Sequence, residues 1–239
     1  MFGLGTLINV VAIIIGGIFG GLFGKLLKES HQDALCKACG VCVLFIGISG
    51  ALEGMLQLTD GKIVSGGSML IIASLAIGGL VGELLNIEGL FERFGAWLKE
   101  KTGNSRDRQF VDAFVTASLT VCIGAMAVVG SIADALQGDI SILVTKAILD
   151  LIIIMVMTCS MGKGCVFSAV AVAIFQGSMT ALALLLKPLM TEAALGNIST
   201  VGSILIFCVG VNLVWGKKVR VANLLPALII AVIWAFLPL

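Results

Sequence analysis

The sequence contains few charged residues: 12% of its 239 positions are Asp, Glu, Lys or Arg, whereas a typical soluble domain has about 25%. Hydrophobic residues fill 59% of the chain, and the mean hydropathy is +1.15. Such a composition indicates an integral membrane protein. The net charge is +1 and no block of basic residues is present, which excludes binding to nucleic acid through a basic surface.

Histidine occurs only once, at His31, and this scarcity bears on catalysis. No serine or cysteine has a histidine and an acid in a recognisable arrangement, and no loop has the spacing that holds phosphate. Intramembrane hydrolysis by aspartates needs two of them deep in the membrane, and Asp150 is the only aspartate that we expect there. The sequence therefore predicts neither an enzyme nor a bound cofactor.

Cysteine occurs seven times, an odd number, and mostly within apolar stretches, which does not suggest a disulfide framework. The spacing Cys36-x-x-Cys39-x-x-Cys42 resembles that of zinc or iron–sulfur ligands. It falls on a predicted helix that enters the membrane, and no fourth ligand is nearby. We therefore expect no metal site there.

Long apolar runs make up most of the chain and predict an all-α fold, a polytopic bundle of transmembrane helices in one domain over residues 1–239. Runs of about 20 residues favour helices over the strands of a membrane barrel, which alternate over about 10 residues. The lipid bilayer is therefore the first expected partner. Eight spans are predicted, at residues 2–24, 34–57, 65–86, 109–136, 140–161, 164–187, 197–216 and 221–238.

The one long loop carries a helical pattern at residues 88–101. Its apolar residues recur at helical spacing from position 90 to position 98, and charged residues lie between and after them. The pattern is typical of an amphipathic helix, which would lie on the cytoplasmic membrane surface with Trp97 at the level of the lipid headgroups. The alternative is a connector whose aromatic face packs under the bundle.

Cationic residues accumulate in every second loop and predict the orientation of the chain. Twelve of the 15 Lys and Arg residues lie in the loops after the first, third, fifth and seventh spans. Lys62 and Lys187 lie on the opposite side, and Lys146 lies within a span. Because positively charged loops stay in the cytoplasm, both chain termini are predicted to lie outside it.

Glycine is abundant, with 30 residues against three prolines, which fits close packing between membrane helices. Residues 15–20 (IGGIFG) and 77–82 (IGGLVG) are similar, and both place glycines four positions apart. This similarity predicts internal parallel repeats of helical hairpins. The same Gly-rich faces are candidate contacts with a second copy of the chain in a homo-oligomer.

A charged pair lies inside the span predicted at 140–161. A Lys or Asp at mid-membrane costs about 2.5 to 3.5 kcal/mol on insertion scales, so each needs a partner, water or a function. Lys146 and Asp150 are four residues apart, share one face of a helix and can pair there. Two interpretations follow: a carboxylate that takes up a proton or a cation, and a static ion pair.

Further polar residues fall within other predicted spans and are expected to converge on the bundle interior. Glu83, Asp112 and Asp134 lie near span ends, where we expect solvated or helix-capping groups. Gln176-Gly177 lies near mid-span, where glycine can interrupt a helix, as in many transporters; an ordinary membrane helix is the alternative. The candidate site residues are Asn9, Glu53, Thr116, Lys146, Asp150, Gln176, Asn212 and Asn223.

Several short stretches carry a resemblance that covers essentially the whole chain: residues 5–9 (GTLIN), 77–83, 114–119 (FVTASL), 130–132 (GSI), 145–150, 167–169 (FSA), 176–180, 210–213 and 221–227 (VANLLPA). In these stretches the sequence resembles the YqgA/YdfK-like family of bacterial inner-membrane proteins, a domain of unknown function. The resemblance implies a multi-pass protein of the bacterial inner membrane. It implies no reaction and no substrate.

Together these features favour a transporter or channel for a small polar or ionic solute, with proton coupling through Asp150 as one option. The alternative is a scaffold or accessory subunit that does not transport and whose polar residues only lock the helix packing. A hydrated path to Asp150 would distinguish the two hypotheses.

Overall fold

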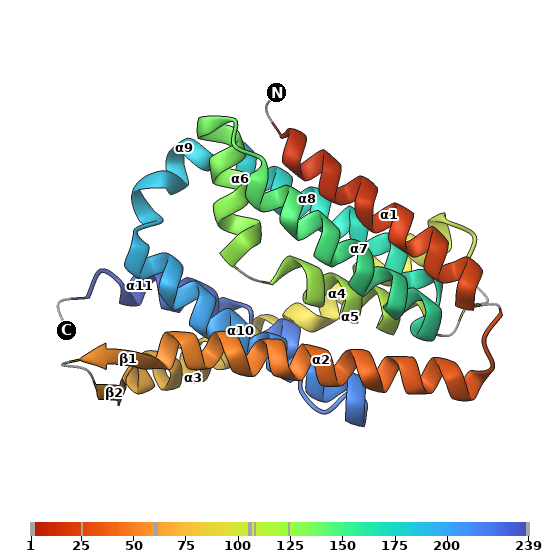
Figure 1. Cartoon of the computed structure of the whole chain (residues 1–239), viewed down its shortest axis with the longest axis horizontal. Coiled ribbons are helices and arrows are strands. Elements are labelled where there is room, and N and C mark those ends of the chain that lie inside the picture. The colour runs from red at the N-terminus through yellow and green to blue at the C-terminus, as the bar shows by residue number, and fades with distance from the viewer. Residues whose placement is uncertain are drawn as a thin grey trace.

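The computed structural model describes residues 3–24, 26–59, 62–104, 107, 109–123 and 125–237, and Figure 1 shows a bundle made almost entirely of helices. The expected all-α membrane fold is thereby confirmed. In chain order the elements are α1 (Leu4–Gly24), α2 (Glu29–Met55), β1 (Leu56–Thr59), β2 (Lys62–Ser65), α3 (Ser68–Leu85), α4 (Ile87–Lys101), α5 (Phe110–Cys122), α6 (Ala125–Gln137), α7 (Ser141–Met161), η1 (Lys163–Phe167), α8 (Ser168–Ala181), α9 (Ala183–Leu186), η2 (Lys187–Leu189), α10 (Glu192–Trp215), η3 (Val221–Leu224) and α11 (Pro226–Trp234).

Six helical segments of the described chain are long and apolar enough to cross a membrane, namely α1, α2, α3, α7, η1 with α8, and α10. The span predicted at 109–136 is instead divided into α5 and α6, whose axes differ by 61°, and counting this pair as one span gives seven. The span predicted at 221–238 consists of η3 and the short helix α11. Pro226 begins α11, since proline fits the first position of a helix but not its interior.

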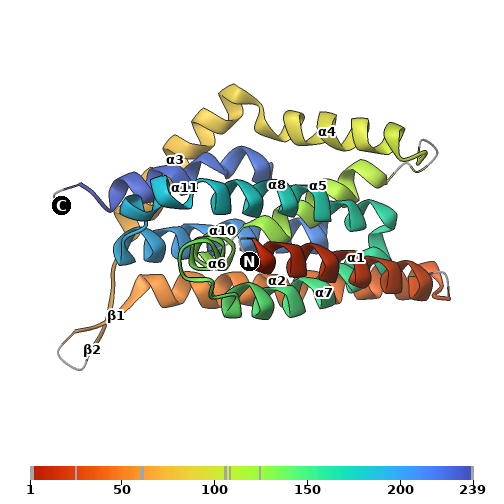
Figure 2. The ribbon, with the colours of Figure 1, turned by 90° about the horizontal axis from the view of Figure 1, so that it is seen from above.

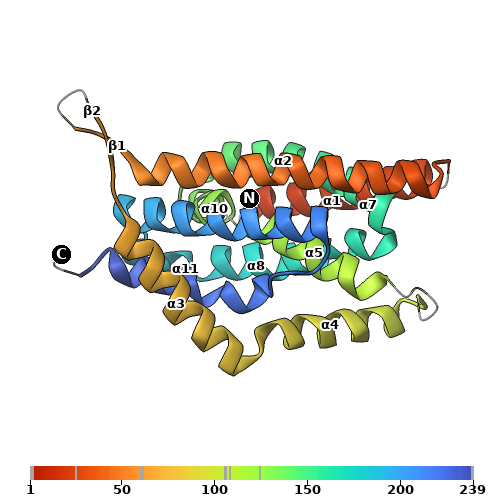
Figure 3. The same cartoon turned by 90° about the horizontal axis from the view of Figure 1, so that it is seen from below.

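The connection between α2 and α3 contains a hairpin that the sequence analysis did not predict. Strands β1 and β2 pair in antiparallel fashion, with Leu56 opposite Ser65 and Thr59 opposite Lys62. The hairpin projects away from the helices at the end of α2 (Figure 3). Each strand has only four residues, so its alternation is hard to recognise between two apolar runs.

Glycines set the distance between α1 and α7. A Cβ atom at Gly16 or Gly20 would overlap a main-chain carbonyl oxygen of α7, that of Leu151 or Met155 respectively. Gly24 faces Cys159 in the same way, one turn further along both helices. The two helices therefore run parallel and in close contact, as small residues four apart allow.

Two further pairs of helices use glycine in the same manner, but in antiparallel orientation. On α2, Gly47 faces Phe207 of α10 and Gly54 faces Thr200. On α3, a Cβ atom at Gly82 would overlap the carbonyl oxygen of Asn223, and Gly78 faces the start of α11. Thus α1 and α3 share the spacing of their glycines but not the direction of their partners, and the repeat of hairpins stays a prediction.

The predicted surface helix exists as α4, which lies along one side of the bundle in Figure 2. Its Phe94 ring packs edge-on against Phe114 of α5 at a centroid distance of 5.8 Å and stacks on Trp97. Leu98 is buried, whereas Trp97 is half exposed. The helix therefore combines both alternatives, because its aromatic face contacts the bundle while Trp97 stays accessible; its cytoplasmic position stays a prediction.

Candidate functional site

The central charged pair forms as predicted from its spacing and gains a third member from α1. Lys146 Nζ lies 2.8 Å from Asp150 Oδ2, and both residues belong to α7. Asn9 of α1 donates a hydrogen bond from Nδ2 to Asp150 Oδ2 at 3.0 Å. Exposed fractions are 0% for Asn9, 7% for Lys146 and 3% for Asp150. The cluster is therefore closed to the surroundings.

The glycine contact between α1 and α7 fixes this cluster. Because Gly16 lies against Leu151 and the helices are parallel, Asn9, two turns before Gly16, comes beside the first half of α7. Its amide nitrogen binds Asp150, so its carbonyl oxygen Oδ1 points elsewhere, and this buried oxygen has no protein hydrogen-bond partner. The cluster thus holds a neutral ion pair together with an unused acceptor.

Asp134 on α6 is a second buried carboxylate, and it is more deeply buried than its position near the end of a predicted span suggests. Its Oδ2 accepts a hydrogen bond from the backbone N–H of Gly5 at 2.9 Å, so it caps the start of α1 as one of the two expected alternatives. Yet its exposed fraction is only 2%, and Oδ1 has no partner. The signal in the sequence was its flanks, since Ile132, Ala133, Ala135 and Leu136 are all apolar.

Gln176 also lies in the interior, on α8, and is 1% exposed with both side-chain polar atoms unpartnered. Of the two alternatives for Gln176-Gly177, the structure shows the ordinary membrane helix, because α8 continues without a break to Ala181. Gly17 of α1 contacts Val166, and Val10 lines a shallow groove with Ala173. These contacts show that α1 and α8 are antiparallel. Continuing their register places Gln176 beside the first two turns of α1.

The break in the helical path occurs instead between α5 and α6. Cys122, the last residue of α5, lies close enough to Lys146 and Asp150 to interact electrostatically with both. The end of one half-helix therefore lies near the buried ion pair. Interrupted helices next to buried polar groups are a common way of building solute sites in transporters.

Unpartnered buried polar atoms are concentrated in one group of helices. Among the described residues, eleven buried side-chain polar atoms lack a hydrogen-bond partner, and nine of them belong to α1, α5, α6, α7 and α8. In Figure 1 most of these helices form the upper part of the molecule, above α2 and α10. In a bilayer such atoms need a ligand or a water molecule. The nine atoms come from Thr6, Asn9, Ser118, Asp134, Thr158, Ser168, Gln176 and Thr180.

Asn212 and Asn223 lie in another part of the structure, where they stabilise turns. Asn212 donates to the carbonyl oxygen of Val219 at 2.7 Å and accepts from the N–H groups of Lys218 and Val219, which closes the turn after α10. Asn223 accepts from the N–H of Glu88 at 2.7 Å and so supports the start of α4. Both residues therefore have a structural use outside the central cluster.

The remaining two candidates differ from expectation in their surroundings. Thr116 is half-buried and lines a small polar cavity of about 200 Å³ together with Asp112 and Asn212. Glu53 lies near the end of α2 and is exposed, so it does not join the bundle interior as expected. Its position two residues from the end of a helix explains this, because the side chain can leave the packed face there.

Charged side chains form a network around the start of α4. Lys217 pairs with Glu88 at 2.7 Å and with Glu92 at 2.6 Å, and Arg220 pairs with Glu83. Partial burial lowers the pKa of Lys217, but its hydrogen bonds and charge interactions with the two glutamates outweigh this and raise it above its ordinary value. The ion pairs of Lys217 are therefore intact at neutral pH and are lost only as the pH rises through that raised pKa.

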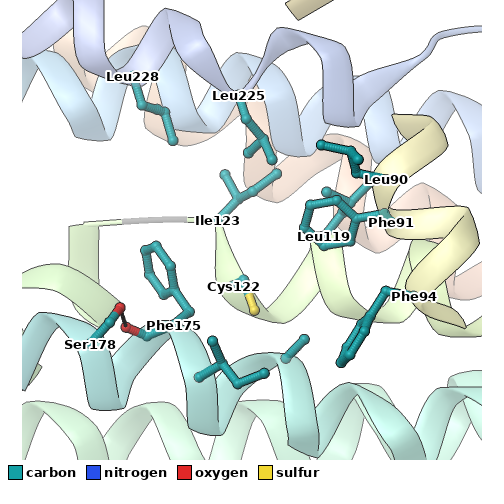
Figure 4. Close-up of a pocket in the computed structure, with 12 residues that line it drawn as sticks. Leu90, Phe91, Phe94, Leu119, Cys122, Ile123, Phe175, Ser178, Leu225 and Leu228 are labelled. Atoms are coloured by element: carbon teal, nitrogen blue, oxygen red, sulfur yellow. Dashed lines mark hydrogen bonds between the residues drawn. The ribbon is translucent and has the colours of Figure 1, made fainter. Parts of the chain in front are cut away.

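A larger cavity of about 410 Å³ lies between α4, α5, α8 and α11 (Figure 4). Phe91, Phe94 and Phe175 line it with several leucines, and Ser178 supplies its one hydroxyl group. A lining of this kind suits an acyl chain better than a polar solute. We therefore do not include this cavity in the candidate polar site.

The three clustered cysteines differ in their surroundings. Cys36 and Cys39 are half-buried and pack against the core, and the Cys36 thiol lies 3.8 Å from the carbonyl oxygen of Leu213. Cys42 is exposed. In the part of the chain that the structure describes, no three or more His, Cys, Asp or Glu residues are grouped so that they could hold a metal ion.

Comparison with known proteins gives two relatives along nearly the whole chain. An uncharacterized membrane protein, YdfK of Bacillus subtilis, is 34% identical over 226 residues, which cover 95% of this chain and 93% of YdfK. An uncharacterized protein, YqgA of Escherichia coli, is 27% identical over 232 residues, covering 95% and 94% respectively. No solved structure matches the chain. The model of the family described as a protein of unknown function, DUF554, matches residues 4–236, and the chain therefore belongs to this membrane-protein family.

Proposed function

We propose that this protein moves a small polar or ionic solute across the bacterial inner membrane, as a transporter or channel, and that Asp150, Lys146 and Asn9 lie on its path. Asp150 is the residue at which a proton or the solute itself would be taken up. No enzymatic activity is part of the proposal, and no reaction is needed for it.

One observation supports this proposal above the others: a helical path broken between α5 and α6 near a buried ion pair, within the helices that hold most of the unpartnered polar atoms. A protein that needed these residues only for packing would gain most from pairing every polar group. Unpartnered polar atoms on the helices that carry or contact a buried ion pair are instead expected where a solute or ion replaces water.

Water access to Cys122 tests the proposal, because this native thiol lies near Lys146 and Asp150. In a variant that keeps only Cys122, a charged, membrane-impermeant maleimide should label the protein in membranes, because such a reagent reaches the thiol through water and not through the apolar cavity that Cys122 also lines. Soluble thiol reagents from one side should compete. A variant that keeps only Cys165 is the matched control, since Cys165 is fully buried and should stay unlabelled. If the maleimide labels neither Cys122 nor Cys165, the hydrated path is contradicted.

The alternative is a scaffold or accessory subunit, and the closed state of the cluster is the observation that favours it. Asp150 and Lys146 neutralise each other and are almost fully buried. Purified protein in liposomes separates the two functions: under the transport proposal, Lys146→Met combined with Asp150→Leu abolishes pH-dependent flux of ions or small solutes but leaves the protein folded, since both partners of the buried pair are replaced together. A scaffold gives no flux in the unmodified protein either.

We also propose that the protein forms a homo-oligomer, but the glycines of residues 15–20 and 77–82 that face other helices of the same chain are not its contact surface. Gly16 and Gly20 are covered by α7, and Gly78 and Gly82 are covered by η3 and α11. A homo-oligomer would therefore use other helix faces.

A further inference from the structure

Asp134 is a buried acid without the kind of cationic partner that Lys146 provides for Asp150 in the cluster of Asn9, Lys146 and Asp150. It is 2% exposed, and only the backbone N–H of Gly5 binds one of its oxygens. The partial positive charge at the start of α1 compensates part of a full negative charge. The other oxygen, Oδ1, has no hydrogen-bond partner among the residues that the structure describes. An ionised carboxylate in this position is stabilised by a further cation.

The charged side chains that the structure describes on the helices around Asp134 leave a net negative charge. The helices in contact with α6 are α1, α7, α8, α9 and α10. Among them, α1, α8 and α9 carry no ionisable acid or base, α7 contributes Lys146 and Asp150, and α10 contributes Glu192 at its first turn. Since Lys146 is already bound to Asp150, no free cationic side chain on these helices is available to Asp134.

Other unpartnered oxygens lie at the same level of the bundle. Gly5, which binds Asp134, and Asn9, which binds Asp150, are one helical turn apart on α1. The register of α1 against α8 brings Gln176 level with the residues between them. Helices α1, α6 and α8 contact one another in all three combinations. Asp134 Oδ1, Asn9 Oδ1 and Gln176 Oε1 are buried acceptors from these three helices.

We infer that Asp134, Asn9 and Gln176 form a binding site for a dehydrated sodium ion at the contact of α1, α6 and α8, one helical turn from the Lys146–Asp150 pair. Carboxylate and amide oxygens are ligands that hard cations prefer. One bound monovalent cation would neutralise Asp134 and use oxygens that the protein leaves unpaired. Ordered water could use the amide oxygens but would leave the charge uncompensated.

If the proposed transport function holds, this sodium ion is carried together with the solute. Only that consequence rests on the proposed function. Binding itself is a property of the resting protein. The Lys146–Asp150 pair then acts next to the ion, and Asn9 bridges the two positions because its nitrogen binds Asp150 while its oxygen is left for the cation.

Sodium binding to the purified full-length protein in detergent tests the inference. Titration with sodium chloride, at constant ionic strength with choline chloride, should raise the melting temperature in a saturable manner, because a ligand of the folded state stabilises it. Calorimetric titration should give the same dissociation constant. Asp134→Asn keeps an oxygen that can cap Gly5 and should weaken binding at least about tenfold, the usual effect of losing a charged partner.

Asp139→Asn is the matched control, because Asp139 also binds a backbone N–H, that of Ser141, but is exposed in the loop before α7. This variant should bind sodium like the unmodified protein. If Asp134→Asn does not fold, Gln176→Leu serves in its place and should also weaken binding by about tenfold.

Three results would overturn the inference: no sodium-specific shift in the unmodified protein, unchanged binding in Asp134→Asn or Gln176→Leu, or stability that depends on pH but not on sodium. Sodium binding without flux in liposomes would refute the transport proposal alone. Flux without sodium binding would refute this inference alone.

Discussion

At the scale of single residues, two buried carboxylates in the same group of helices are held in different ways. Asp150 has a full counter-charge in Lys146, whereas Asp134 has only the start of a helix. A buried ion pair contributes little net stability, but removing one of its partners leaves the other uncompensated. The two acids should therefore respond differently to substitution.

Lys146→Met should destabilise the protein by about 3 to 5 kcal/mol, because it leaves Asp150 in a low dielectric without its cation. Lys146→Met combined with Asp150→Leu should recover most of this loss, since apolar residues can replace a buried pair at little cost. Thermal or denaturant unfolding in detergent measures both effects.

Lys163→Met is the control for this pair of variants, since Lys163 is exposed, and it should change stability by no more than about 0.5 kcal/mol. If the double variant is as unstable as Lys146→Met alone, the loss of stability in Lys146→Met does not come from leaving Asp150 without its partner.

At the scale of helices, close glycine contacts determine the partners of α1, α2 and α3. Each of these helices has glycines whose added Cβ atom would collide with the backbone or side chains of a helix distant in sequence. A stripe of small residues identifies a contact face but not its partner. The partner follows from which backbone comes within reach, and here α1 pairs with α7, α2 with α10, and α3 with η3 and α11.

Gly20→Ala should cost about 1 to 3 kcal/mol, because its Cβ atom would overlap the carbonyl oxygen of Met155 and force α1 and α7 apart. Gly21→Ala is a neighbouring control, since its Cβ atom would meet only Thr158 Cγ2, at 3.9 Å. This second change should be neutral or slightly stabilising, as alanine favours a helix. Similar melting temperatures for the two variants would argue against a tight contact between α1 and α7.

At the scale of the whole molecule, the polar interior lies mainly in α1 and α5 to α8, whereas the charged network lies at the junction of α3, α4, α10 and η3. Its cations belong to the set that predicts a cytoplasmic side. The parallel direction of α1 and α7 and the antiparallel directions of the other two pairs agree with the alternation that this topology requires.

Reporter fusions provide the test of topology. A fusion at residue 100 should be active as a cytoplasmic reporter, and fusions at residue 139 and after residue 239 should be active as external reporters. The physical reason is the retention of twelve cations in the cytoplasm. The reverse pattern at all three positions would invert the topology.

By itself the sequence determined that this protein lies in a lipid bilayer and that its fold is helical. It also determined the family of the chain and the pairing of Lys146 with Asp150. These properties follow from composition or from spacing along one helix, so they need no knowledge of neighbours. The exposure of Glu53, the burial of Asp134 and the use of Asn212 and Asn223 in turns did not follow from the sequence. Each depends on which backbone lies within a few ångströms of that side chain.

The bend between α5 and α6, and the meeting of Asn9 with Asp150, were likewise decided by the tertiary structure. An apolar run of 28 residues at 109–136 has the same composition whether it is straight or bent, so hydropathy cannot detect the break. Asn9 and Asp150 are 141 residues apart in sequence. Only the close parallel approach of α1 and α7, which their glycines permit, brings the amide to the carboxylate.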